Sequence, residues 1–169
     1  AEMSSEASRL TAGNADGAGG ASSIGGFIKI DPMDGLEIGF GTGEAGAATA
    51  GDKSQTDDHT TAYISYVYGP LTIAYQQSEV ETYTAAQSDD ESTNWGILYA
   101  VNDEMSINYV SHTNEDDVKT ATDEEVTGWG ASYTSGSMTF KAHRNKGTNI
   151  GNAASKTSEH TEIGVTFAF

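Results

Sequence analysis

The chain has 169 residues, enough for one domain, of which 36% are hydrophobic, and it carries 20 glycines and a formal net charge of -17. This acidity excludes a role in binding nucleic acid, which needs clustered Lys and Arg, and the absence of cysteine excludes disulfides and thiolate metal sites. No run approaches the roughly 18 apolar residues that a membrane helix needs. The low hydrophobicity alone would favour disorder, but aromatic residues recur regularly inside strand-like runs. A barrel that shows its apolar side to lipid and encloses water needs no conventional core, and it fits this composition.

Alternating side chains and turn residues predict about nine strands and no amphipathic helix of useful length. In chain order the strands are expected at about 24–31, 36–41, 60–68, 71–79, 93–101, 105–113, 126–134, 138–145 and 160–169. Short connections rich in glycine, proline, Asp and Asn alternate with long polar ones, at about 42–59, 80–92, 114–125 and 146–159. Short turns at one rim and long polar loops at the other are typical of an outer-membrane barrel.

The last segment, 162–169, alternates strictly and shows how the two faces divide. Ile163, Val165, Phe167 and Phe169 fall on one face, and small or polar residues fall on the other. In a soluble sandwich or lipocalin-like barrel the apolar face would point inward, whereas in an outer-membrane barrel it points to lipid. No residue assigned to the apolar face in the nine strands is charged, and a Lys or Arg at mid-bilayer would cost roughly 2–4 kcal/mol. Arg144 has the parity of this face, but it lies near the outer rim, where it can snorkel to water.

We therefore predict an all-β fold: an antiparallel up-and-down transmembrane β-barrel in the bacterial outer membrane. The polar residues expected to line the pore have the opposite parity and are Lys29, Glu37, Gln76, Asn94, Asn108, His112, Lys141, His143 and Glu162. Aromatic residues are expected at the membrane interfaces, which outer-membrane barrels mark with aromatic girdles. They are Tyr68, Trp95, Tyr99, Tyr109, Trp129, Tyr133, Phe167 and Phe169.

Acidic clusters are expected on the long loops, and oxygen-rich loops can bind Ca²⁺ or Mg²⁺. The candidate metal ligands are Asp89, Asp90, Glu91, Glu115, Asp116 and Asp117, although the EF-hand ligand spacing is absent and a solvated acidic surface is the alternative. In either case an acidic outer mouth would concentrate cations, which predicts weak cation selectivity. The four histidines show no metal-ligand spacing. No catalytic motif such as G-x-S-x-G or H-E-x-x-H occurs, so we expect no enzyme activity and no other cofactor.

Four segments together carry a family resemblance: the C-terminal 163–169, the hairpins 66–75 and 98–107, and the Pro-Met-Asp-Gly-Leu turn at 32–36. They resemble the C-terminal half of bacterial outer-membrane general porins of the alphaproteobacterial type, over most of 24–169. The resemblance implies a sixteen-stranded, trimeric diffusion pore. It also implies that Lys29, Lys141 and His143 belong to the basic wall of the pore eyelet, the alternative being ordinary water-facing residues. The chain departs from this family by lacking the N-terminal half, which contains the inward-folded third loop.

The order of turns and loops also predicts how the chain is placed in the membrane. With the short turns at the periplasmic rim, residues 1–22 would form an external loop segment or tail, and 23–169 would be the C-terminal strands of the barrel. The expected function is passive diffusion of small hydrophilic solutes and ions. The alternative is a small non-conducting barrel that serves as an anchor or adhesin. The expected partners are outer-membrane lipid and lipopolysaccharide, two further copies in a homotrimer, and the missing N-terminal half of the barrel.

Overall fold

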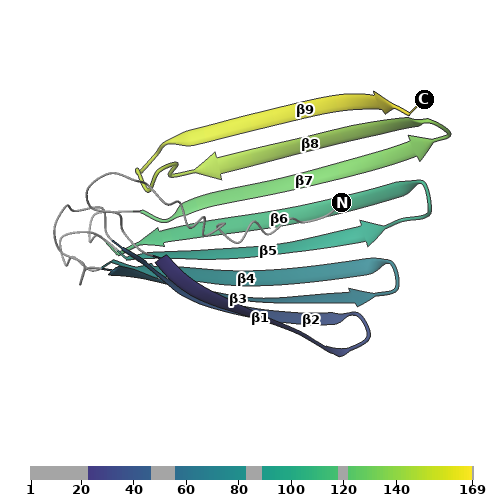
Figure 1. Cartoon of the computed structure of the whole chain (residues 1–169). Coiled ribbons are helices and arrows are strands. Elements are labelled where there is room, and N and C mark those ends of the chain that lie inside the picture. Colours follow the sequence, from purple (N-terminus) through teal and green to yellow (C-terminus); the bar gives the residue numbers. More distant parts are fainter. Residues whose placement is uncertain (1–22, 47–55, 83–88, 118–121, 169) are drawn as a thin grey trace, which may run out of the picture.

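The computed structural model describes residues 23–46, 56–82, 89–117 and 122–168. These residues form one sheet of nine antiparallel strands, each paired with its neighbours in chain order (Figure 1). The strands are β1 (Ser23–Met33), β2 (Leu36–Gly46), β3 (Thr56–Tyr68), β4 (Leu71–Glu81), β5 (Asp90–Ala100), β6 (Met105–Asp116), β7 (Glu124–Ser135), β8 (Met138–Thr148) and β9 (Thr157–Phe167). The predicted all-β, up-and-down antiparallel fold is confirmed. No helix within the described ranges has the length and apolar character required to cross a membrane.

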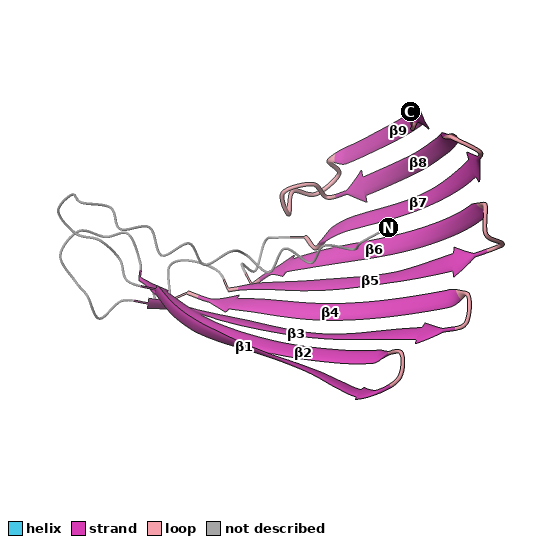
Figure 2. Ribbon diagram, turned by 45° about the vertical axis from the view of Figure 1, so that its right-hand side comes forward, coloured by secondary structure: helices cyan, strands magenta, loops and turns pink. Residues whose placement is uncertain are grey.

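The sheet is strongly curved, and its two rims differ. Figures 1 and 2 show it bending from β1 and β2 at the bottom to β9 at the top, with the short turns gathered at one rim and the long connections at the other. The turn chemistry explains the short rim. Gly35 and Gly69 have positive φ values of 76° and 55°, and the Asn102 side chain accepts hydrogen bonds from two backbone N–H groups, those of Glu104 at 2.9 Å and Met105 at 2.8 Å. The predicted alternation of short and long connections is therefore confirmed for the described strands.

Several strands extend further toward the long-loop rim than the sequence pattern predicted. β2 continues to Gly46, β3 begins at Thr56, and the pair β5 and β6 includes Asp90 and Asp116. Glycine and acidic residues are depleted in strands, so the pattern ended each strand too early. Pairing with a neighbouring strand supplies backbone hydrogen bonds whatever the side chain. These bonds extend the strands into segments of low strand propensity. Most of the acidic residues that were expected on loops therefore lie at strand ends.

The sheet has two distinct faces and no conventional core. The described residues contain no buried hydrophobic side chain, while large apolar side chains such as Ile163 (77% exposed) and Ile28 (67% exposed) stand in the open. Along β4 the outward Ile73 and Tyr75 are exposed, and the polar or small residues between them are partly shielded. Side chains on the inside of a curved sheet converge and shield one another, so the polar face is the concave one.

Candidate functional site

The concave face carries all nine residues that were expected to line a pore. Directly paired residues share a face, and the register places Tyr63, Gln76, Asn94 and His112 in one row across β3 to β6. A second row runs across β6 to β9 from Asn108 through a glycine to His143 and Glu162. Lys29 and Glu37 are on the same face of β1 and β2, and Lys141 is on the same face of β8. Their common face follows from the register, and their role in lining a pore stays a prediction.

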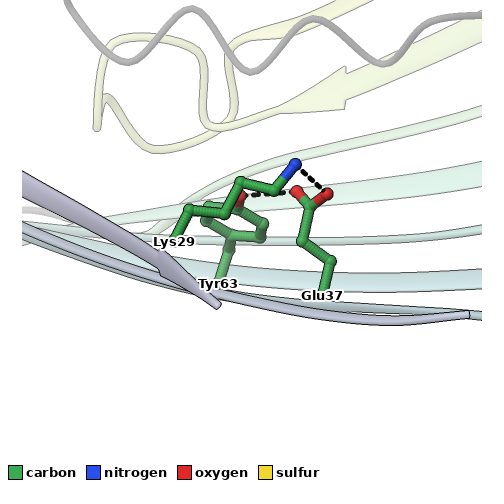
Figure 3. A network of polar contacts seen from close by, with 3 residues as sticks. All are labelled: Lys29, Glu37 and Tyr63. Atoms are coloured by element: carbon green, nitrogen blue, oxygen red, sulfur yellow. Dashed lines mark hydrogen bonds and ion pairs between the residues drawn. The ribbon is translucent and has the colours of Figure 1, made fainter. Parts of the chain in front are cut away.

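Lys29, Glu37 and Tyr63 form a polar cluster on the inner side of the curve (Figure 3). The Lys29 ammonium makes an ion pair with Glu37 Oε2, and the Tyr63 hydroxyl donates a hydrogen bond of 2.5 Å to Glu37 Oε1. The Tyr63 ring lies against Gly39, where a Cβ atom would collide with it, and stacks on Phe27 at 6.0 Å between centroids. Lys29 is thus not an isolated cation on the wall, because its charge is balanced by the adjacent carboxylate.

Short polar side chains bond to one another along the rest of the wall. Gln76 Nε2 donates to Thr61 Oγ1 at 3.2 Å and to Ser78 Oγ at 3.3 Å. The His112 ring and the Asn94 amide are joined at 2.8 Å. Two of these bonds join neighbouring strands and the Gln76–Ser78 bond lies within β4, so the side chains are held against the sheet. Along the described strands this face is mostly polar or small, with a few apolar side chains such as Phe27 and Val110.

His143, His160 and Glu162 meet at the concave surface of β8 and β9. Glu162 Oε2 lies 3.5 Å from the Nε2 atom of His143 and 3.5 Å from the Nε2 atom of His160. Strand pairing creates this cluster: His143 is directly opposite Glu162, and His160 precedes Glu162 by two residues on the same face. Linear spacing indicated no histidine metal site, and that expectation stays untested, although strand pairing brings these three side chains together from two strands. The His-x-Glu pair facing a histidine across the hairpin was the available signal.

The six acidic residues proposed as Ca²⁺ or Mg²⁺ ligands do not form one cluster. Asp90 is paired with Asp116 on the concave face, while Glu91 is paired with Glu115 on the convex face. Period 2 sends neighbours in a strand to opposite sides, so each run of acidic residues is divided between the two faces. Asp89 lies just before β5, where its carboxylate accepts a 2.7 Å hydrogen bond from the backbone of Thr82. Its carbonyl accepts one from Asp117 at 3.1 Å. Binding of Ca²⁺ or Mg²⁺ by any of them stays a prediction.

The convex face presents a wide uncharged zone. On β2 to β7, the outward residues between the turn rim and the first carboxylate carry no charge over about eight to ten residues. That length is about 26–34 Å along a strand, or roughly 20–26 Å across a bilayer at a tilt near 40°, against an apolar band of about 25 Å in known barrels. A row of carboxylates follows at the loop rim: Glu44, Asp58, Glu79, Glu81, Glu91, Glu115 and Glu125.

The aromatic residues expected at interfaces all lie on this convex face, except Phe169, which is outside the described residues. They form two rows. Tyr68, Tyr99, Tyr133 and Phe167 lie beside the turn rim, and Trp95, Tyr109 and Trp129 lie about 13 Å further along their strands. The second row marks where the apolar zone gives way to threonines, and Trp95 and Tyr109 pack there at 5.2 Å between ring centroids. Arg144 on β8 lies beside this second row, opposite Trp129, and makes an ion pair with Glu159 at 2.9 Å.

Comparisons with known proteins give a likeness in structure and none in sequence. No protein-family model and no curated protein matches the sequence. The chain is similar in structure to the anion-selective porin from Comamonas acidovorans, with a TM-score of 0.68 and 14% sequence identity over 87% of this chain and 49% of that porin.

The fold is porin-like. At this identity the likeness establishes the arrangement of strands and carries no further property of that porin across. The chain spans about half the length of the porin it matches. Correspondence to a C-terminal half, and to the alphaproteobacterial type of porin, stays a prediction.

Proposed function

We propose that this porin-like sheet forms part of the wall of a water-filled β-barrel in the bacterial outer membrane, through which small hydrophilic solutes and ions diffuse passively. The observation that supports it most strongly is the difference in polarity between the two faces of the sheet. On β2 to β7 the convex face is uncharged over a length that matches a bilayer and apolar up to the second aromatic row, and the concave face is mostly polar or small. With water inside the barrel and hydrocarbon outside it, each face contacts a solvent of matching polarity. Such a sheet is stable without a buried core.

Closure of such a barrel requires strands beyond the nine described here. β1 and β9 are the two edges of the described sheet, and exposed edges invite pairing with further strands. We propose that additional strands of the same barrel pair there, and that three barrels associate as the family resemblance implies. Outer-membrane lipid and lipopolysaccharide would then contact the apolar zone and the rim above it. No chemical step is part of this function.

We propose weak cation selectivity, because acidic residues gather at the loop rim on the inner face as well as the outer one. The inner ones are Asp57, Asp90, Asp116 and Glu124, on strands β3, β5, β6 and β7. Their field would raise the local concentration of cations over about 8 Å at physiological salt. The similar porin is named as anion-selective. Selectivity follows from the charges of each pore, so the acidic residues of this chain are the basis of the proposal.

Planar-bilayer recording tests both parts of the proposal. We expect stable conductance steps when the whole barrel, with the strands that pair with β1 and β9, is added, and in a KCl gradient a reversal potential of the sign that marks a preference for K⁺. A reversal potential showing a clear preference for Cl⁻ would contradict the selectivity. Absence of any conductance would instead favour a narrow, non-conducting barrel acting as an anchor or adhesin. The small side chains of the concave face argue against that alternative, because a narrow barrel fills its interior with large ones.

A further inference from the structure

We infer that His143, His160 and Glu162 form a binding site for Zn²⁺ or a similar first-row transition metal on the polar wall of β8 and β9. The three potential ligand atoms lie within 4.8 Å of one another, and no other group of this kind occurs in the described part of the chain. The site is separate from the acidic strand ends, and the pore function does not require it.

The distances fit a tetrahedral ion. Ligands that each lie about 2.0–2.1 Å from a tetrahedral metal are separated from one another by roughly 3.3–3.5 Å. The Glu162 Oε2 atom lies 3.5 Å from the Nε2 atom of each histidine, so two of the three ligand–ligand separations already have this value. The rings of His143 and His160 are 6.0 Å apart between centroids and tilted by 40°, and their exposed Nε2 edges can converge by small side-chain rotations.

The backbone holds these ligands in place. His143 is paired with Glu162, and Asn145 is paired with His160, in an unbroken ladder between two eleven-residue strands. All three ligands point from the same face, so no strand has to shift or turn for them to meet. The side chains are 42% to 64% exposed, which leaves at least one coordination position open to water or a passing solute.

The ligand types select the metal. Two neutral imidazoles and one carboxylate suit Zn²⁺, Cu²⁺ or Ni²⁺, whereas Ca²⁺ and Mg²⁺ prefer sites made of oxygen alone. Two histidines and one glutamate with an open position is also the ligand set of several zinc enzymes. We infer binding of the metal and propose no reaction at this site. If the proposed pore exists, a bound dication would reverse the sign of the local wall charge and reduce passage of cations.

Calorimetric titration with Zn²⁺ tests the site directly. The full chain in detergent micelles would be titrated in a buffer with excess Ca²⁺, which occupies carboxylate-only sites. We expect one Zn²⁺ per chain, and at least about tenfold weaker binding in H143Q, H160Q and E162Q, since even outer-shell changes cost roughly 10–100-fold. H112Q is the matched control, because His112 is on the same face and is bonded to Asn94. It should bind as tightly as the parent.

The visible spectrum of bound Co²⁺ tests the coordination geometry. The parent protein should show the intense bands of a tetrahedral complex, and H160Q should lack them. Parent protein that takes up no Zn²⁺ in excess Ca²⁺ would overturn the inference, as would three ligand variants that bind like the parent. Zn²⁺ binding without bilayer conductance would establish the site and refute the pore, and conductance without Zn²⁺ binding would do the reverse.

Discussion

A charged residue placed on either face of β3 should distinguish lipid from water. Ile64 points from the convex face, is 44% exposed, and lies between Ile38 and Tyr75 on the neighbouring strands. It is roughly midway between the turn at Gly69 and the first outward carboxylate of its strand, Asp58. I64K would therefore put an ammonium group near the middle of the hydrocarbon. The expected loss is about 2–4 kcal/mol, or roughly 30- to 1,000-fold in the folding equilibrium.

The next residue provides the control, because its side chain points to the other face. Ser65 lies opposite Glu37 and Ala74 on the concave side, so S65K would place the same charge in water beside a carboxylate. Its expected effect is within about 0.5 kcal/mol, as for an ordinary surface substitution. Urea titration in phosphatidylcholine vesicles, followed by the fluorescence of Trp95 and Trp129, would measure both free energies of unfolding. Equal losses for I64K and S65K, or a harmless I64K, would refute the assignment of the faces.

Three further outcomes follow from the contacts on the two faces. G39A should destabilise the protein by about 1–3 kcal/mol, because the new methyl group displaces the Tyr63 ring, and most of this loss should vanish in a Y63A background. Equal losses in both backgrounds would refute the packing account. E115K, which faces Glu91 across the β5–β6 pair, should stabilise the sheet by about 0.2–1 kcal/mol at low salt and by less at 1 M salt. A gain independent of salt would show that charge is not the cause. The preference for cations in reversal-potential measurements should likewise weaken as ionic strength rises, and a constant preference would place its origin away from the acidic rim.

Period-2 alternation was enough to predict the sheet and both of its faces. Alternation assigned each residue of a strand to one of two faces, and directly paired residues must share a face. The observed register agrees with these assignments in all eight strand pairs. The lengths of the strands were harder to predict, because the residues near the loop rim have low strand propensity. Those residues are held in the sheet by hydrogen bonds to the adjacent strands. The sequence of a single strand does not reveal that pairing.

The polar side-chain clusters on the concave face were the least predictable feature, because they too depend on how the strands pair. Lys29, Glu37 and Tyr63 come from three strands, and His143 and Glu162 from two, so their contacts depend on register and not on spacing along the chain. Register could be estimated from turn lengths at the short rim, where the connections are tight. His143 and Glu162, however, face each other across the long connection between β8 and β9, so turn length does not give their register. The acidic residues show the opposite case, since residues that are neighbours in sequence, such as Asp90 and Glu91, lie on opposite faces of the sheet.

The two faces do not support the membrane proposal equally. Small residues on the concave side, such as Gly96 and Gly130, are favoured by curvature itself, because side chains on the inside of a bend crowd one another. Curvature therefore accounts for part of this composition in a curved sheet of any purpose. The convex side has no such steric restriction, and water there would accept Lys and Glu at any position. On β2 to β7 its freedom from charge over a bilayer's thickness therefore has no explanation in the geometry of the sheet, and contact with hydrocarbon supplies one.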